Sequence, residues 1–136
     1  MLGDLIAEIA SQDTGRRVLA TTDGVHPVVE VSFEGNGRVL GVPVTEFATY
    51  ESQMRSDGSM FGEGQGVGMS EKGETYSWHG SGIGTFTGAG GGMHWRGVIY
   101  LDSPSDVFSR LNDVVGLFEY DTDGSGKGVS KVSEWK

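Results

Sequence analysis

Residues 62–68 read GEGQGVG, with a glycine at every second position, and residues 77–86 (SWHGSGIGTF) repeat the pattern at Gly80, Gly82 and Gly84. In a β-strand, successive side chains point to opposite faces, so each segment has one face that carries only hydrogen atoms. Glycine weakens a strand, because it loses more backbone entropy on folding and packs no side chain. We therefore expect two neighbouring strands whose bare face lies against bulky rings or an enclosed space.

The rest of the chain also has the composition of β-structure. Segments rich in β-branched and aromatic residues, several with an alternating pattern, lie at 16–22, 27–34, 37–54, 59–70, 74–87, 93–101, 114–121 and 128–135. Turn-forming sequences separate most of them. Eight strands joined by short hairpins predict an antiparallel all-β meander, which either opens as a sandwich or closes as an up-and-down barrel. We expect the eight-stranded barrel, in one domain that covers residues 1–136.

Two short helices are expected beside the strands. Residues 1–11 are predicted to form a helical N-terminal extension, because apolar side chains recur at helical spacing at Leu2, Leu5, Ile6 and Ile9. Residues 104–112 are predicted to form a second helix, with Ser103 as its N-cap and Pro104 at its first position. Phe108 and Leu111 would face inward from it.

The hairpin loops predict how the glycine-rich strands pair with their neighbours, and so which residues share the bare face. The loops SDG (56–58) and EKG (71–73) have three residues with glycine last, which is typical of a turn followed by a bulge. This register places Tyr50 opposite Gly64 and Trp78 opposite Gly66, so that large rings cover the bare face.

A two-residue loop at Lys72 and Gly73 is the alternative. It shifts one strand by a residue and places Glu63, Gln65, Val67 and Trp78 on one face. We favour the first register on loop chemistry.

The composition excludes several classes of function. The chain has no cysteine, so disulfides, thiolate catalysis and cysteine-based metal sites are excluded. A formal charge of −9 disfavours nucleic acid and anionic membranes as partners. No long apolar run predicts a membrane span, and the N-terminal residues lack the pattern of a signal peptide, so a cytoplasmic location is expected.

No motif in the sequence predicts a metal or cofactor. The glycine segments lack the spacing of a dinucleotide or P-loop fingerprint. The stretch DTDGSG (121–126) starts like a calcium loop, but position twelve is Val132 and not glutamate, so a hairpin turn is expected there. His26, His79 and His94 lie on separate segments without metal-ligand spacing.

The candidate ligand-binding residues are those that either register places near the bare face. Glu46 shares that face with Tyr50 in the favoured register, and an interior carboxylate would have a raised pKa. Trp95 and Arg96 point to opposite faces of one strand, and either could be the inward one. The candidate set is Glu46, Tyr50, Glu63, Gln65, Trp78, Trp95 and Arg96.

The chain contains the segments GEGQGV…WHGSGIG…WRG…FEY and, at residues 132–136, the aromatic stretch VSEWK. In these segments it resembles small uncharacterised bacterial proteins with an allene oxide cyclase-like barrel, a fold also found in dirigent proteins. The resemblance covers about residues 16–135 as a layout of strands. It implies an apolar cavity and frequent homo-oligomers, and it assigns no catalytic residue.

Three functions follow as hypotheses. The first is a binding module that holds a small apolar or amphipathic molecule inside the barrel. The second is a structural protein with a filled barrel, which self-associates through the N-terminal helix. The third is an isomerase or cyclase in which an interior carboxylate, Glu46 or Glu63, transfers a proton.

Overall fold

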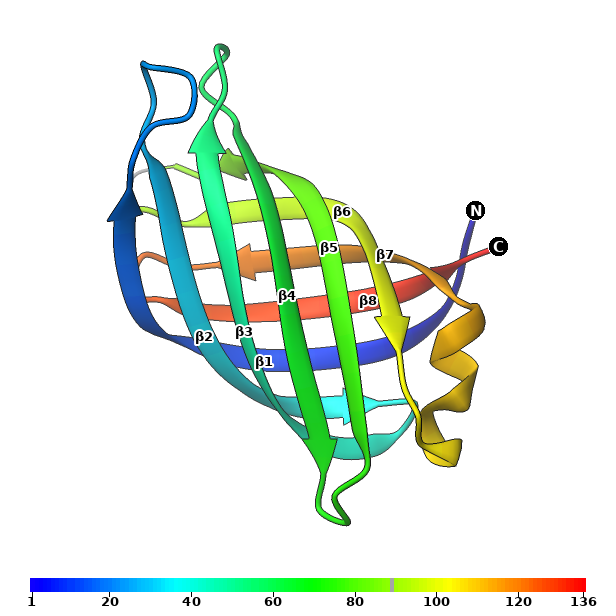
Figure 1. The fold of residues 1–136 in the computed structure, drawn as a ribbon. Coiled ribbons are helices and arrows are strands. Elements are labelled where there is room, and N and C mark those ends of the chain that lie inside the picture. The colour runs from blue at the N-terminus through cyan, green and yellow to red at the C-terminus, as the bar shows by residue number, and fades with distance from the viewer. Residues whose placement is uncertain (89) are drawn as a thin grey trace.

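The structure is a computed structural model that describes residues 1–88 and 90–136. It is a closed barrel of eight antiparallel strands in sequential order (Figure 1). The strands are β1 (Leu2–Leu19), β2 (Val28–Val39), β3 (Val42–Met54), β4 (Met60–Ser70), β5 (Thr75–Phe86), β6 (Met93–Asp102), β7 (Val115–Thr122) and β8 (Lys127–Trp135). The predicted up-and-down barrel is confirmed, and the open sandwich is excluded because β1 pairs with both β2 and β8.

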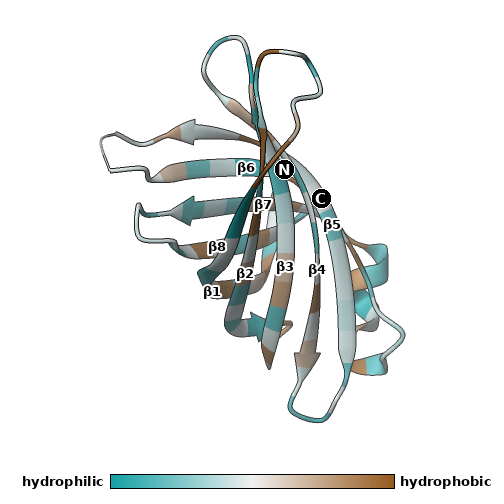
Figure 2. Cartoon of the chain, turned by 60° about the vertical axis from the view of Figure 1, so that its left-hand side comes forward, coloured by the Kyte–Doolittle hydropathy of each residue, from teal (hydrophilic) through white to brown (hydrophobic). Residues whose placement is uncertain are grey.

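Side chains alternate between the interior and the outer surface along most strands. In β2, Val31, Phe33 and Val39 are buried, whereas Glu34 and Arg38 between them are exposed. Figure 2 shows the same alternation as bands of hydrophobic and hydrophilic residues, while the glycine-rich β5 stays pale. A barrel of eight strands has an interior just wide enough for side chains or one small ligand.

The prediction of a helix at residues 1–11 is wrong, because these residues belong to β1. The register of β1 against β8 shifts between Leu5 and Ala7, so Ile6 and Ala7 are both buried although they are adjacent. This irregularity breaks the period of two and leaves apolar residues at a helix-like spacing. Leu2 and Leu5, which the helix would have buried, are 65% and 54% exposed.

A short helix closes one end of the barrel. The 3₁₀-helix η1 (Asp106–Asp113) lies near the predicted residues 104–112, and its Phe108 and Leu111 are fully buried, as expected. The N-cap is Ser105, not Ser103. The Ser103 hydroxyl instead donates to the carbonyl of Thr75 at 2.6 Å, which ties the entry to η1 to the start of β5.

The hairpin loops have the predicted form, so the favoured register is confirmed. Gly58 and Gly73 have φ values of +88° and +83°, which is the conformation that a turn-plus-bulge loop requires of its last residue. Tyr50 pairs with Gly64 and Trp78 pairs with Gly66. The alternative register, which placed Glu63 and Trp78 on one face, is therefore wrong.

Candidate functional site

The bare face of β4 is covered by rings from the neighbouring strands. A Cβ atom built on Gly66 would lie 2.4 Å from Nε1 of Trp78, and one built on Gly68 would lie 2.2 Å from Cζ of Tyr76. A Cβ atom on Gly62 would lie 2.8 Å from Cζ3 of Trp95. The glycines are therefore needed at these positions because aromatic side chains lie directly on the backbone.

Tyr76 and Trp78 cross β4 in order to reach one carboxyl group on β3. Glu46 pairs with Gly68, and Gly68 pairs with Tyr76, so the tyrosine ring passes over the glycine toward the glutamate. The Tyr76 hydroxyl donates to Oε1 of Glu46 at 2.8 Å, and Nε1 of Trp78 donates to the same oxygen at 3.1 Å. The alternating glycines thus allow two donors from β5 to hydrogen-bond a carboxyl group two strands away.

Glu46 places its carboxyl group inside the barrel, and only 6% of the residue is exposed. Burial raises the pKa of Glu46 above its ordinary value, and the hydrogen bonds from Tyr76 and Trp78 act in the opposite direction. Burial, with the nearby Glu46 as a second cause, also raises the pKa of Tyr76. Tyr76 therefore keeps its proton and remains a donor.

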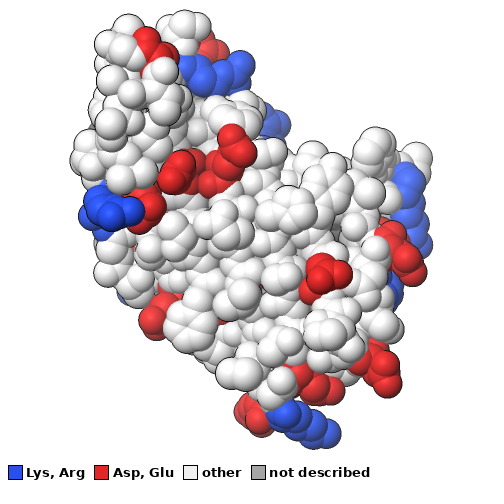
Figure 3. Space-filling model, in the orientation of Figure 1, with Lys and Arg blue, Asp and Glu red and all other residues white. Residues whose placement is uncertain are grey.

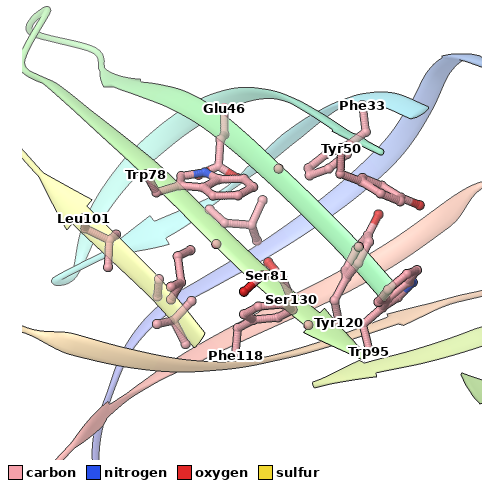
Figure 4. A pocket seen from close by; sticks show the side chains of 18 of the residues that line it. Phe33, Glu46, Tyr50, Trp78, Ser81, Trp95, Leu101, Phe118, Tyr120 and Ser130 are labelled. Atoms are coloured by element: carbon pink, nitrogen blue, oxygen red, sulfur yellow. The ribbon is translucent and has the colours of Figure 1, made fainter. Parts of the chain in front are cut away.

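A cavity of about 90 Å³ lies beside Glu46 (Figure 4). One wall is the backbone of β4 and β5 at Gly62, Gly64, Gly80 and Gly82. The facing side chains are almost all apolar and include Ile99, Phe118 and Val132, with Ser130 as a small polar member. Pockets for drug-sized ligands have volumes of roughly 300–1,000 Å³, so this cavity fits only a small molecule or part of a larger one.

An aromatic cluster borders the cavity on the side away from Glu46 and Trp78 (Figure 4). Tyr50 contacts Phe33, Trp95 and Tyr120, with ring centroids 6.1, 5.8 and 6.4 Å apart. Trp95 is 4% exposed, and its Nε1 has no hydrogen-bond partner among the described residues. Burial raises the pKa of Tyr120 to about 12, so this phenol is neutral as well.

The sequence-predicted candidates divide into two groups. The side chains of Glu46, Tyr50, Trp78 and Trp95 face the interior and surround the cavity.

The side chains of Glu63, Gln65 and Arg96 are exposed on the outer face. Glu63 borders the cavity only through its position between Gly62 and Gly64. The strict alternation of β4 and β6 is the physical reason, since the inward positions are the even-numbered glycines and Trp95. These three side chains cannot contact a molecule inside the barrel.

Gln65 lies instead in an open groove on the outer surface of β2–β5, with Phe47, Val67 and His79. Figure 3 shows a largely uncharged area over the middle of this face, with charged residues nearer its margins.

Neither a metal site nor a membrane helix is found in the described part of the chain. No group of three or more His, Cys, Asp or Glu side chains there could hold a metal ion. Among the same residues, no helix has the length and apolar character needed to cross a membrane.

Sequence reasoning missed Tyr76, Phe118, Tyr120 and Ser130. A signal for Tyr76 was present, because it lies two residues before Trp78 and so shares its face, opposite Gly68. Tyr120 and Ser130 pair across the β7–β8 hairpin, whose loop ends in Gly126 at a φ of +89°, so the same loop chemistry could have placed these two residues on one face.

Known structures share this fold. A conserved protein of unknown function from Rhodopseudomonas palustris superposes with a TM-score of 0.82 at 11% identity, covering 98% of this chain and 97% of that one. A protein with unknown function from Clostridium acetobutylicum gives 0.79 at 10% identity, covering 98% of both chains. An enzyme from Penicillium herquei gives 0.64 at 12% identity, covering 98% and 96%.

No protein-family model and no curated protein sequence matches the chain. At these identities, the structural likeness shows the closed barrel and nothing about activity.

Proposed function

We propose that the barrel binds a small, largely apolar molecule in the cavity between its glycine wall and Phe118, with Glu46 as the main polar contact. The observation that carries this proposal is a partly enclosed, largely apolar cavity with one buried carboxyl group at its edge. Ligand sites are commonly apolar cavities with a few polar groups that fix orientation. η1 covers one end of the barrel, so a ligand would enter past the aromatic cluster of Phe33, Tyr50, Trp95 and Tyr120.

The size of the cavity limits the ligand. An apolar cavity of about 150 Å³ accommodates benzene, whereas this one measures about 90 Å³. Xenon should therefore enter without rearrangement, and benzene should enter after a modest movement of the surrounding rings.

Binding of xenon and benzene, followed by NMR chemical-shift changes, tests the proposal. Shifts should concentrate on the backbone of Gly62, Gly64, Gly80 and Gly82. Ser130→Leu, which adds apolar atoms inside the cavity, should abolish them. Ser77→Leu adds the same atoms to the exposed outer face of β5 and should leave them unchanged. If neither probe shifts these glycines, the proposal fails and a structural protein with a filled barrel becomes the better reading.

An isomerase or cyclase is the second candidate, and buried Glu46 beside the cavity favours it. Burial raises the pKa of this carboxyl group, which is the direction that favours a catalytic proton donor or acceptor. The similar fold of the Penicillium herquei enzyme supports the capacity of this barrel for catalysis. The test is exchange of the α-hydrogens of cyclopentanone with D₂O, which the wild-type protein should accelerate and Glu46→Gln should not. Equal rates with and without protein would remove this candidate.

Three expectations from the sequence stay predictions: membership of the allene oxide cyclase-like barrel proteins, a cytoplasmic location, and the formation of homo-oligomers. Self-association through an N-terminal helix is withdrawn, because that segment is part of β1.

A further inference from the structure

The two oxygen atoms of the Glu46 carboxyl group have different surroundings. Oε1 accepts hydrogen bonds from both Tyr76 and Trp78. Among the described residues, no hydrogen bond ends on Oε2. Because Glu46 borders the cavity, this second oxygen is the one left for a ligand.

This asymmetry matches a protonated carboxylic acid. The carbonyl oxygen of such an acid has two lone pairs, and the other oxygen carries the proton. Two donors on Oε1 give it the carbonyl role, so the proton belongs on Oε2. An ionised group would instead leave a negatively charged oxygen without a partner beside an apolar wall, which is costly.

The charges around Glu46 favour the same state. The ionisable groups that influence it or respond to it are Tyr76 on β5 and Tyr120 on β7, and both are neutral phenols. No Lys, Arg or His of the described chain forms an ion pair with Glu46. Desolvation is therefore not offset by a cation.

We infer that Glu46 donates a hydrogen bond from Oε2 into the cavity, so that the ligand of this barrel is a small carbonyl compound whose oxygen accepts it. The inference rests on the proposed binding function and specifies its ligand class. Ketones, aldehydes and esters offer such an oxygen on an otherwise apolar body. Ammonium compounds are disfavoured, because a neutral carboxylic acid carries no charge that would offset the cost of moving their cation into an apolar cavity.

A matched pair of probes tests the ligand class. Cyclopentanone and methylenecyclopentane have the same ring and differ in C=O against C=CH₂. Titrations followed by NMR should show that the wild-type protein binds the ketone about 2- to 12-fold more tightly, the range expected for one hydrogen bond.

Glu46→Gln should keep this preference, since an amide can accept with its oxygen and donate with its nitrogen as the protonated acid does. Glu46→Leu should lose it. Glu51→Gln makes the same exchange at an exposed position of β3 and should behave as the wild type.

The infrared difference spectrum of wild type minus Glu46→Gln gives a second measurement, which does not depend on ligands or on whether Glu46→Leu folds. It should contain the C=O band of a protonated carboxylic acid at neutral pH. A carboxylate band in its place would overturn the inference.

The binding outcomes separate the two proposals. Equal affinity of the wild type for both probes, or a ketone preference that arises only in Glu46→Gln, overturns the inference and leaves the binding function intact. Failure of both probes while xenon still binds also overturns the inference. Failure of xenon and benzene as well overturns the proposed function itself.

Discussion

Replacing Gly68 with alanine should destabilise the barrel, because the new methyl group would overlap the Tyr76 ring. The added Cβ would lie 2.2 Å from Cζ and 2.3 Å from the hydroxyl oxygen of Tyr76. The ring has little freedom to move away. It is 2% exposed, contacts Phe108 at a centroid distance of 5.3 Å, and hydrogen-bonds Glu46.

The size of the effect follows from three contributions. Overpacking a core costs about 1–3 kcal/mol, and distortion of the bond between Tyr76 and Glu46 adds about 0.5–1.5 kcal/mol. Alanine recovers about 0.4–1 kcal/mol, because it reduces the entropy of the unfolded chain. We expect a net loss of about 0.5–4 kcal/mol in the free energy of unfolding for Gly68→Ala.

Gly15→Ala is the matched control. No atom lies within 4 Å of the Cβ that it would add, and Gly15 does not have a positive φ. This variant should be neutral or slightly more stable than the wild type, by up to about 1 kcal/mol.

Urea unfolding followed by tryptophan fluorescence measures both variants, with the free energy taken from the midpoint and slope. A double-mutant cycle adds Tyr76→Leu, which removes the ring that the methyl group overlaps. Gly68→Ala should then cost less, with a coupling of about 0.5–3 kcal/mol. If Gly68→Ala matches Gly15→Ala in stability, or if the coupling is zero, the explanation of the alternating glycines is wrong.

Three further predictions concern Glu46 and the helix η1, which closes one end of the barrel. The pKa of Glu46 is raised in the folded protein, so above pH 4.5 the folded protein keeps a proton that the unfolded chain releases. The stability of the wild type should therefore fall, relative to that of Glu46→Gln, as the pH rises from 4.5 toward the pKa of folded Glu46. Parallel pH profiles of the two proteins would contradict this. Trp78→Phe removes one hydrogen-bond donor to Glu46 and should cost about 0.5–1.5 kcal/mol in the free energy of unfolding, measured in urea. It should also extend the pH range over which stability falls to higher pH, and an unchanged range would argue against this hydrogen bond. Phe108→Ala should cost about 3–5 kcal/mol in the same assay, because Phe108 is fully buried. Val107→Ala, at the exposed neighbouring position, should change stability by less than about 0.5 kcal/mol. Similar losses in both variants would mean that η1 does not close the end of the barrel through Phe108.

The part of the structure that sequence could predict is the part set by local chemistry. The glycine at the end of SDG (56–58) and of EKG (71–73) specifies a loop form, the loop form specifies the register, and the register places Tyr50 and Trp78 over β4. Phe108 and Leu111 were predictable in the same way, because one short helix has one apolar side.

The remainder depends on contacts between distant parts of the chain. Residues 1–11 have a helical pattern, but β2 and β8 offer them two strand edges, and that pairing outweighs the local signal. The direction of Trp95 and Arg96 could not be predicted, since β6 follows a loop without a clear turn type. That Tyr76 and Trp78 share one oxygen of Glu46 depends on side-chain rotamers, which no residue pattern encodes.

The pairing of β1 with β8 also has a consequence for how the protein folds. Leu2 pairs with Trp135, so β1, which is synthesised before the other seven strands of the barrel, gains its second neighbour only when β8 has been made. Until then, both β1 and the growing meander present an unpaired edge. We expect slow closure, because the first and last strands of the barrel must come together. At high concentration, β8 of another molecule could fill the gap first, giving strand-exchanged dimers as the characteristic misfolded product.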